Sequence, residues 1–206
     1  MAGLESQESL LESVPPNEIA EPSPSPSSST DWKRGLLDFA ETVALAVVLF
    51  LIINAISARV RVDGQSMLPT LNNGEFVLVN RLAYKLGEPT RGDIVVFRST
   101  TQMDLDLIKR IIGVPGDEVR ISDGHVIVNE VTQIEPYISA DPSYSGEWSV
   151  PDGYLFVLGD NRNDSSDSHA WGLLPVENLI GKAILIYWPP PDWAVLDHVD
   201  TAVAAP

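Results

Sequence analysis

The sequence contains no cysteine among its 206 residues. Disulfide frameworks and thiolate zinc sites both require cysteine, so both are excluded. The three histidines, His125, His169 and His198, lie far apart and lack the spacing of a metal site. Basic residues are also few, since 13 lysines and arginines accompany 29 acidic residues and leave a formal charge of −16. A nucleic-acid-binding surface needs the opposite balance, and we expect no metal, no cofactor and no nucleic-acid partner.

The first part of the chain is a polar segment that differs from the rest. Residues 1–31 contain five prolines, many serines and six acidic residues, but no lysine or arginine. Such a segment cannot bury enough apolar surface to offset the entropy lost on ordering, so we predict a disordered tail. Docking of a partner protein is the alternative function for a tail of this composition.

An apolar segment follows the tail. Residues 36–58 are almost wholly apolar, and the range Thr42–Ala58 contains no charged residue. As a helix this segment would extend about 35 Å at about 1.5 Å per residue, which is enough to cross a bilayer. We therefore predict a transmembrane anchor over residues 32–58. Because residues 55–57 form a small-x-small triplet, a cleavable signal peptide is the competing interpretation.

The remainder of the chain, residues 59–206, has the pattern of a β protein. Short runs of β-branched and aromatic residues are separated by turn signals, and no long amphipathic helical pattern alternates with them. The runs lie at residues 76–79, 94–97, 126–128, 154–158 and 183–188. We predict a strongly bent antiparallel sheet system, with a looser excursion at about residues 122–151 that is rich in serine, proline, tyrosine and glutamate.

The first candidate for chemistry is Ser66, in the motif GQSMLPTL. It lies between Gly64 and Pro69, which can bend the chain sharply and expose a hydroxyl. Leu68 occupies the second glycine position of a Gly-x-Ser-x-Gly elbow, and Pro69 rules out Ser-x-x-Lys. A serine in a turn is most often structural, so Ser66 is a candidate nucleophile only if a base lies nearby.

Lys109 is the candidate base, in the motif IKRIIGVPGD. If this run is extended, Lys109 shares one face with Leu107 and Ile111, and desolvation then lowers the pKa of its amine. A useful general base requires a fall of about three units from about 10.4, which corresponds to about 4 kcal/mol. Asp104 and Asp106 would oppose that fall, so we expect them to face away. A lysine that snorkels at a sheet edge is the alternative.

A third cluster of polar residues, Gly159–His169, directly follows an apolar run. Its many donors and acceptors should therefore lie at the end of a strand and hydrogen-bond one another. This arrangement is typical of residues that support a site, and a surface loop rich in aspartate and asparagine is the alternative.

Four segments behind the apolar stretch match the pattern of one protease family in order. They are Ser66-Met67-x-Pro69-Thr70, residues 91–97, Lys109-Arg110 with Gly113-x-Pro115-Gly116-Asp117, and residues 159–162 continued by Ser165-x-Asp167-Ser168. From about residue 35 to 188 the chain resembles the bacterial type I signal peptidases, which release exported proteins from the membrane. It is similar to their cyanobacterial and thylakoid homologues too. The resemblance implies a mainly β catalytic domain, of the fold shared with self-cleaving Ser/Lys repressors, preceded by one transmembrane helix.

The resemblance also implies roles for individual residues. Ser66 would be the nucleophile and Lys109 the general base of an acyl-enzyme mechanism. The Ser66 N–H would donate to the oxyanion, Ser165 would hydrogen-bond the lysine amine, and Asp167 would support the site. No cofactor is implied.

Two residues depart from the family pattern. Some members supply a second oxyanion donor from a hydroxyl two residues before the nucleophile, where this chain has Gly64. The second donor would then be water, a backbone group or absent, and a lost donor lowers rates by about 10²- to 10³-fold in other enzymes. His169 stands where the family usually has arginine and would be a weaker, pH-sensitive partner for Asp167. With Ser66, these two residues raise the alternative of a Ser-His-Asp triad.

The resemblance further implies a substrate class. Shallow pockets for small residues at the first and third positions before the cleaved bond would be lined by four side chains, Val62, Met67, Leu71 and Ile108. Small pockets exclude larger side chains, which favours cleavage after an Ala-x-Ala type of sequence. Ser66 follows Ala58 by eight residues, so at most about 28 Å of extended chain separates it from the predicted anchor.

Basic residues on the two sides of the anchor are nearly balanced, so charge alone does not orient it. By resemblance, the tail lies in the cytoplasm or stroma and the catalytic domain on the opposite side of a cell or thylakoid membrane. The expected partners are preproteins with signal peptides, the lipid bilayer and nearby protein-export machinery. The alternatives are another Ser/Lys protease, with a self-cleavage or conjugation-type role, and an inactive scaffold or binding domain.

Overall fold

The computed structural model describes residues 31–101 and 105–196. The tail predicted over residues 1–31 lies outside the described residues except for Asp31. Asp104, which we expected to face away from Lys109, lies outside them as well.

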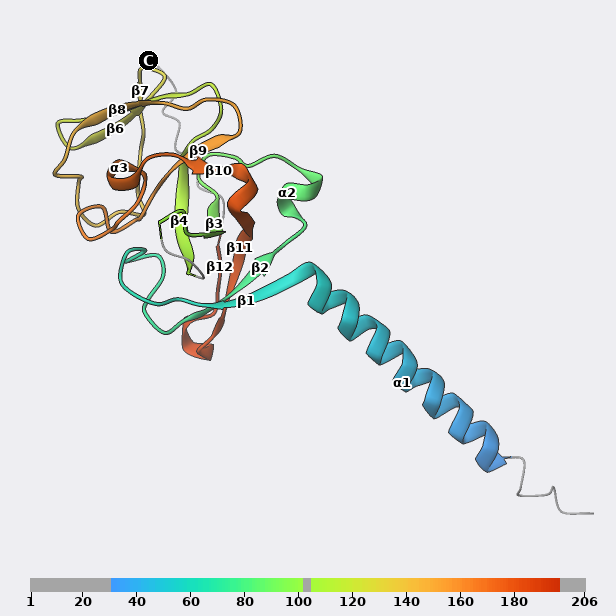
Figure 1. Cartoon of the computed structure of the whole chain (residues 1–206). Helices are drawn as coiled ribbons and strands as arrows, with labels where there is room; N and C mark the ends of the chain where they lie inside the picture. The colour runs from blue at the N-terminus through green and yellow to red at the C-terminus, as the bar shows by residue number, and fades with distance from the viewer. Residues whose placement is uncertain (1–30, 102–104, 197–206) are drawn as a thin grey trace, which may run out of the picture. The chain divides into compact units, whose positions relative to one another are not determined.

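The apolar segment forms one long helix, α1 (Asp31–Ile56), drawn in blue and cyan in Figure 1. Its residues 32–56 are long and apolar enough to cross a membrane, and the apolar stretch is not buried within the described protein. A helix that is apolar and exposed in this way suits a lipid environment. The helix ends two residues before the predicted end of the anchor. There strand β1 (Ser57–Arg61) begins, and Ala58 pairs with Val79.

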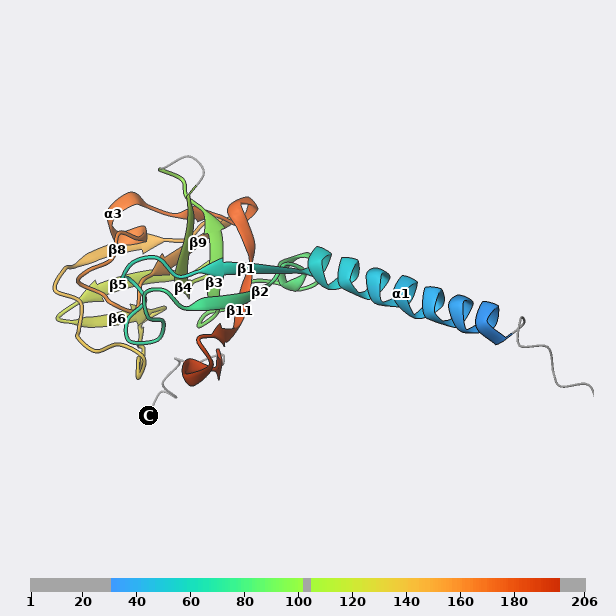
Figure 2. The same ribbon diagram turned by 90° about the horizontal axis from the view of Figure 1, so that it is seen from below.

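Figures 1 and 2 show the larger sheet from two directions. It has eight antiparallel strands. Their order across the sheet is β1, β2 (Phe76–Asn80), β11 (Leu179–Trp188), β3 (Ile94–Arg98), β4 (Asp106–Gly113), β9 (Tyr154–Leu158) and β10 (Leu174–Pro175), with β12 (Ala194–Val195) on β11. The register shifts along β11 and between β4 and β9, and such irregularities bend a sheet. The mainly β, antiparallel fold predicted from the sequence is confirmed.

A smaller sheet of four antiparallel strands gathers at one side of the β-rich region in both views (Figures 1 and 2). Its order is β7 (Val131–Thr132), β6 (His125–Val128), β5 (Glu118–Ser122) and β8 (Gly146–Ser149). This differs from the looser excursion predicted over residues 122–151, since residues 134–145 are the one long stretch within it that lacks a helix or strand. Valines 126 and 128 are fully buried with Phe156 of β9, and that packing orders the strands.

The helical turns of the β-rich region are short. They are α2 (Ala83–Leu86), α3 (Ser168–Trp171), and the 3₁₀ turns Val176–Asn178 and Pro190–Asp192.

Strand β3 separates two apolar cores. Ile94 and Val96 pack into one core and Val95 and Phe97 into the other, as side-chain alternation along a strand requires. Ile108 of β4 belongs to the first core, together with side chains of the segment around Ser66. The residue before Lys109 and the loop that carries Ser66 are thereby joined through one hydrophobic cluster.

Candidate active site

Ser66 lies in a tight turn between β1 and β2. The Leu68 N–H donates to Gln65 O at 3.1 Å, and the Leu71 N–H donates to Met67 O at 2.9 Å. Gly64 has a φ of +100°, a left-handed conformation that favours glycine. Met67, the next residue, is buried in the core, whereas Ser66 is only partly buried. The turn therefore presents the Ser66 hydroxyl at the protein surface.

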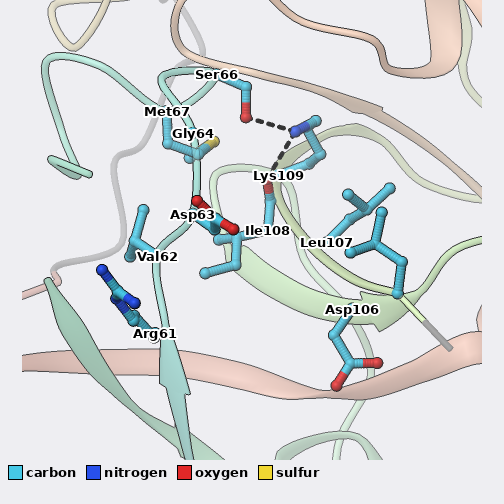
Figure 3. Close-up of a pocket in the computed structure, with 11 residues that line it drawn as sticks. Arg61, Val62, Asp63, Gly64, Ser66, Met67, Asp106, Leu107, Ile108 and Lys109 are labelled. Atoms are coloured by element: carbon cyan, nitrogen blue, oxygen red, sulfur yellow. Dashed lines mark hydrogen bonds between the residues drawn. The ribbon is translucent and has the colours of Figure 1, made fainter. Parts of the chain in front are cut away.

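Lys109 of strand β4 meets Ser66, although 43 positions separate them in the sequence (Figure 3). Its Nζ lies 2.7 Å from Ser66 Oγ and donates to Ile108 O at 3.0 Å. The residue is buried, with 3% of its surface exposed. Among the described residues, the amine therefore contacts one hydroxyl and one carbonyl, and no carboxylate lies within bonding distance of it. This contact brings together the two residues that the sequence analysis singled out separately.

Burial lowers the pKa of Lys109 from 10.5 to about 8, and the negative charges of Asp167 and Asp160 partly oppose this effect. A fall of that size corresponds to about 3 kcal/mol of preference for the neutral amine. The direction agrees with the desolvation argument made from the sequence, but the opposing carboxylates come from a different segment. Asp106, which we expected to oppose the shift if close, points away from the amine in Figure 3.

Asp167 is fully buried beneath the site and accepts from two segments. The Gly159 N–H donates to its Oδ2 at 2.9 Å, and the His169 N–H donates to its Oδ1 at 3.3 Å. His169 Nδ1 lies 2.6 Å from the same Oδ1. The imidazole thus contacts Asp167, whereas the contact of Ser66 Oγ is with Lys109. In the described part of the chain no hydrogen bond joins His169 to Ser66, so the geometry favours the Ser/Lys pair over the Ser-His-Asp alternative.

Ser165 lies beside the site with a buried hydroxyl that makes no hydrogen bond within the described residues. A Cβ added at Gly159 would lie 2.3 Å from Ser165 Oγ and 2.4 Å from Ser66 O, so both groups press against the glycine. Only glycine leaves room for this close approach. The hydrogen bond from Ser165 to the lysine amine, expected from the resemblance, stays a prediction.

The backbone around Ser66 defines which groups can stabilise an oxyanion. The Ser66 N–H donates no hydrogen bond within the described ranges, while its carbonyl accepts from Asn161 N at 3.0 Å. The Gly64 N–H already donates to Asn73 Oδ1 at 3.0 Å. Of these two amides, only that of Ser66 is ready to bind a developing negative charge.

A cleft of about 300 Å³ opens beside Ser66 and Lys109 (Figure 3). It is lined by Arg61, Val62, Asp63, Gly64, Ser66, Met67, Leu105, Asp106, Leu107, Ile108 and Lys109. Three of the four expected substrate-pocket residues, Val62, Met67 and Ile108, are in this set. Leu71 is not. It is fully buried in the core below, because the turn that exposes Ser66 directs this leucine inward.

Comparison with known proteins identifies the family. The family model described as signal peptidase, peptidase S26, matches residues 36–188. The chain is also 44% identical over 162 residues to the probable signal peptidase I-2 of Synechocystis sp., covering 75% of this chain and 74% of that protein. The chain belongs to the signal peptidase family.

Two further relatives agree with this assignment. Signal peptidase I of Leptolyngbya laminosa is 37% identical over 187 residues, covering 86% of this chain and 92% of that protein. The probable thylakoidal processing peptidase 2 of Arabidopsis thaliana is 38% identical over 173 residues, covering 77% of this chain and 47% of that protein. As a member of this signal peptidase family, the chain is a membrane-anchored serine endopeptidase of the type that removes signal peptides. The predicted family, enzyme class and function are confirmed.

A buried ion pair next to Lys109 in this signal peptidase was not predicted from the sequence. Arg110 donates to both oxygens of Asp160, through Nε at 2.8 Å and Nη2 at 2.7 Å, and Thr70 Oγ1 donates to Asp160 Oδ2 at 2.5 Å. Asp160 thereby ties the Ser66 turn to β4. All three residues lie in the quoted motifs, but the sequence contains no signal that pairs residues 50 and 90 positions apart.

Proposed function

We propose that Ser66 is the nucleophile and Lys109 the general base of this signal peptidase. The supporting observation is the 2.7 Å separation of Ser66 Oγ from a buried amine whose pKa is lowered to about 8. With the amine neutral, the hydroxyl donates to Nζ instead of accepting from it. A base within hydrogen-bond distance and with a pKa near the working pH meets both requirements of general base catalysis.

The reaction follows from these two atoms. Ser66 Oγ attacks the carbonyl carbon of the scissile peptide bond as its proton passes to Nζ of Lys109. The tetrahedral intermediate collapses, the protonated amine gives its proton to the leaving nitrogen, and an ester of Ser66 remains. Lys109, neutral again, takes a proton from water as the water oxygen attacks the ester. It then gives this proton to Ser66 Oγ as the ester bond breaks, which frees the serine and the carboxylic acid product. The Ser66 N–H donates to the oxyanion in both halves of the reaction.

The cleft accounts for the preferred cleavage site. Val62, Met67 and Ile108 are buried side chains that form part of its wall, so they leave shallow apolar depressions next to Ser66. Side chains larger than alanine would have to displace well-packed core atoms. We therefore propose cleavage after a small residue, with a second small residue two positions earlier.

We further propose the membrane arrangement and partners. Residues 32–56 span the bilayer, the preceding tail lies in the cytoplasm or stroma, and the catalytic domain lies on the opposite side of a cell or thylakoid membrane. Its substrates are preproteins held in the same bilayer by their signal peptides, close to the export machinery. The short connection between α1 and Ser66 supports this proposal.

Cleavage of a preprotein in detergent tests the nucleophile. Ser66→Ala should abolish cleavage after the small residue and labelling by an acylating serine inhibitor, with the circular dichroism spectrum unchanged. Ser166→Ala is the matched control, since Ser166 is exposed and outside the cleft, and should keep full activity. Labelling of Ser66→Ala would place the nucleophile elsewhere, and folded wild type without either activity would favour a scaffold domain.

A further inference from the structure

His169 is held on two sides next to the site. Its Nδ1 lies 2.6 Å from Asp167 Oδ1, and the ring of Tyr144 stacks on the imidazole with centroids 3.9 Å apart and planes inclined by 15°. A carboxylate only accepts hydrogen bonds, so Nδ1 carries a proton in the neutral imidazole as well as in the charged one. The ring is therefore a fixed donor to Asp167 in both protonation states.

Asp167 connects this imidazole with both members of the dyad. Its second oxygen accepts from the Gly159 N–H at 2.9 Å, and Gly159 lies directly against the Ser66 carbonyl. Its negative charge also acts on Lys109. A change at Oδ1 of Asp167 therefore reaches the Ser66 turn through the contact with Gly159. It reaches Lys109 through the charge of the carboxylate.

We propose that His169 is a positioning residue that acts through Asp167, holding the carboxylate in place and withdrawing part of its negative charge from Lys109. The proposal rests on the assignment of Lys109 as general base. It assigns a role to the histidine that stands where the family usually has arginine. It also gives a reason for the stacking of Tyr144, whose ring keeps the imidazole aligned with the carboxylate.

The electrostatic consequence has a definite sign. Without the imidazole donor, more of the negative charge of Asp167 is felt by Lys109, and an opposite charge nearby favours the protonated amine. Other charged groups surround the pair. Asp160 with its partner Arg110 acts on Lys109, while Glu135 and Arg162 act on Tyr144 behind the imidazole. Substitution of His169 leaves these groups in place, so its effect is separable from theirs.

The test is the pH dependence of kcat/KM for preprotein cleavage by the full-length enzyme in detergent. His169→Ala should move the acid limb of the profile by about half a pH unit toward alkaline pH, which lowers kcat/KM about threefold on that limb. The alkaline plateau should stay within about twofold of wild type. His169→Arg restores a donor and adds a permanent positive charge, so its limb should return to the wild-type position or lie at lower pH.

Control variants separate this role from a structural one. His125→Ala removes an exposed histidine of the smaller sheet and should leave the profile unchanged. His169→Gln keeps an N–H donor and should shift the limb less than His169→Ala. An equal loss at every pH for His169→Ala, or no rescue by His169→Arg in folded protein, would overturn the proposal. An active Lys109→Met variant would instead overturn the dyad itself, so the two failures are distinguishable.

Discussion

Lys109 and Lys182 occupy one row of the larger sheet, where both pair with Val95 of β3 from opposite sides. Lys182 Nζ donates to Asp93 Oδ1 at 2.5 Å and is partly exposed. Lys109 is buried, and its amine contacts a hydroxyl and a carbonyl instead of a carboxylate. The two lysines therefore share a row of the sheet but differ in burial and in the groups that their amines contact.

The difference shows what makes a lysine a base. Burial raises the pKa of Asp93. The hydrogen bonds that the carboxylate accepts, of which the one from Lys182 has the largest effect, outweigh burial and hold the pKa below its usual value. The Asp93 carboxylate therefore stays charged at neutral pH. At Lys109 the carboxylates of Asp167 and Asp160 act only at a distance, so burial prevails and the amine is neutral at mildly alkaline pH. Withholding a direct counter-ion is thus the structural requirement.

The largest effect is expected from removing the amine that we propose as the base. Lys109→Met keeps the shape of the side chain without the amine and should lower kcat/KM about 10⁴-fold or more, because the Ser66 proton then has no acceptor. The melting temperature should not fall, since the substitution relieves about 3 kcal/mol of desolvation. Preprotein cleavage and thermal unfolding by circular dichroism measure the two effects. Activity near that of wild type would show that another group acts as base.

The pH dependence of the wild type is the next largest effect. Only the neutral amine accepts the Ser66 proton, so kcat/KM should fall tenfold per unit below about pH 8. At pH 6 this amounts to about a 100-fold loss. A profile that is flat from pH 6 to 9, with chemistry rate-limiting, would contradict the lowered pKa.

The same pKa predicts a change in stability. Between about pH 8 and 10.5 the unfolded chain binds a proton at Lys109 that the folded protein does not. Stability from this residue should therefore rise with pH across that window. Denaturation of wild type and Lys109→Met over this range measures the difference, and the rise should be absent in the variant.

A smaller contrast is expected between two glycines, Gly159 beside the Ser66 turn and Gly181 next to Lys182. Gly159→Ala would force Ser66 O and Ser165 Oγ apart from the new methyl group, and we expect about a 10- to 100-fold loss of kcat/KM. Gly181→Ala would meet Asn80 O at 2.3 Å in the sheet and should lower stability first. Kinetics and melting temperatures of both variants separate these outcomes. Full activity of Gly159→Ala would show that the Ser66 turn tolerates displacement.

The smallest effect on activity is expected at Lys182. Lys182→Met should keep kcat/KM within about twofold of wild type while lowering stability by about 1–3 kcal/mol, because Asp93 loses a charged partner. For a chain of this size, that is roughly 2–10 °C in melting temperature. The Asp93 contribution is present at neutral pH and lost as pH falls below the usual carboxylate value, so the difference should narrow in acid. A loss of catalysis in folded Lys182→Met would show that Lys182 also contributes to the reaction, in contradiction to the difference proposed between the two lysines.

Local patterns were sufficient for the anchor and for most of the larger sheet. Runs of apolar residues predicted α1 and the strands at 76–79, 94–97 and 154–158, since burial by a bilayer or by a two-sided core leaves a direct imprint on composition. The strands around residues 122–151 were partly missed. Their short alternating pattern was masked by the polar segment between β7 and β8.

The sequence by itself determined the family, the long apolar helix and the two residues that we propose as the dyad, because each lies in a motif readable from neighbouring positions. Only the tertiary structure decided which carboxylates act on Lys109, that Arg110 pairs with Asp160, and that Leu71 belongs to the core. Those outcomes depend on segments that the sheet brings together across 40 to 90 positions of the chain. Charge and burial act through space, so neighbouring residues in the sequence carry no record of them.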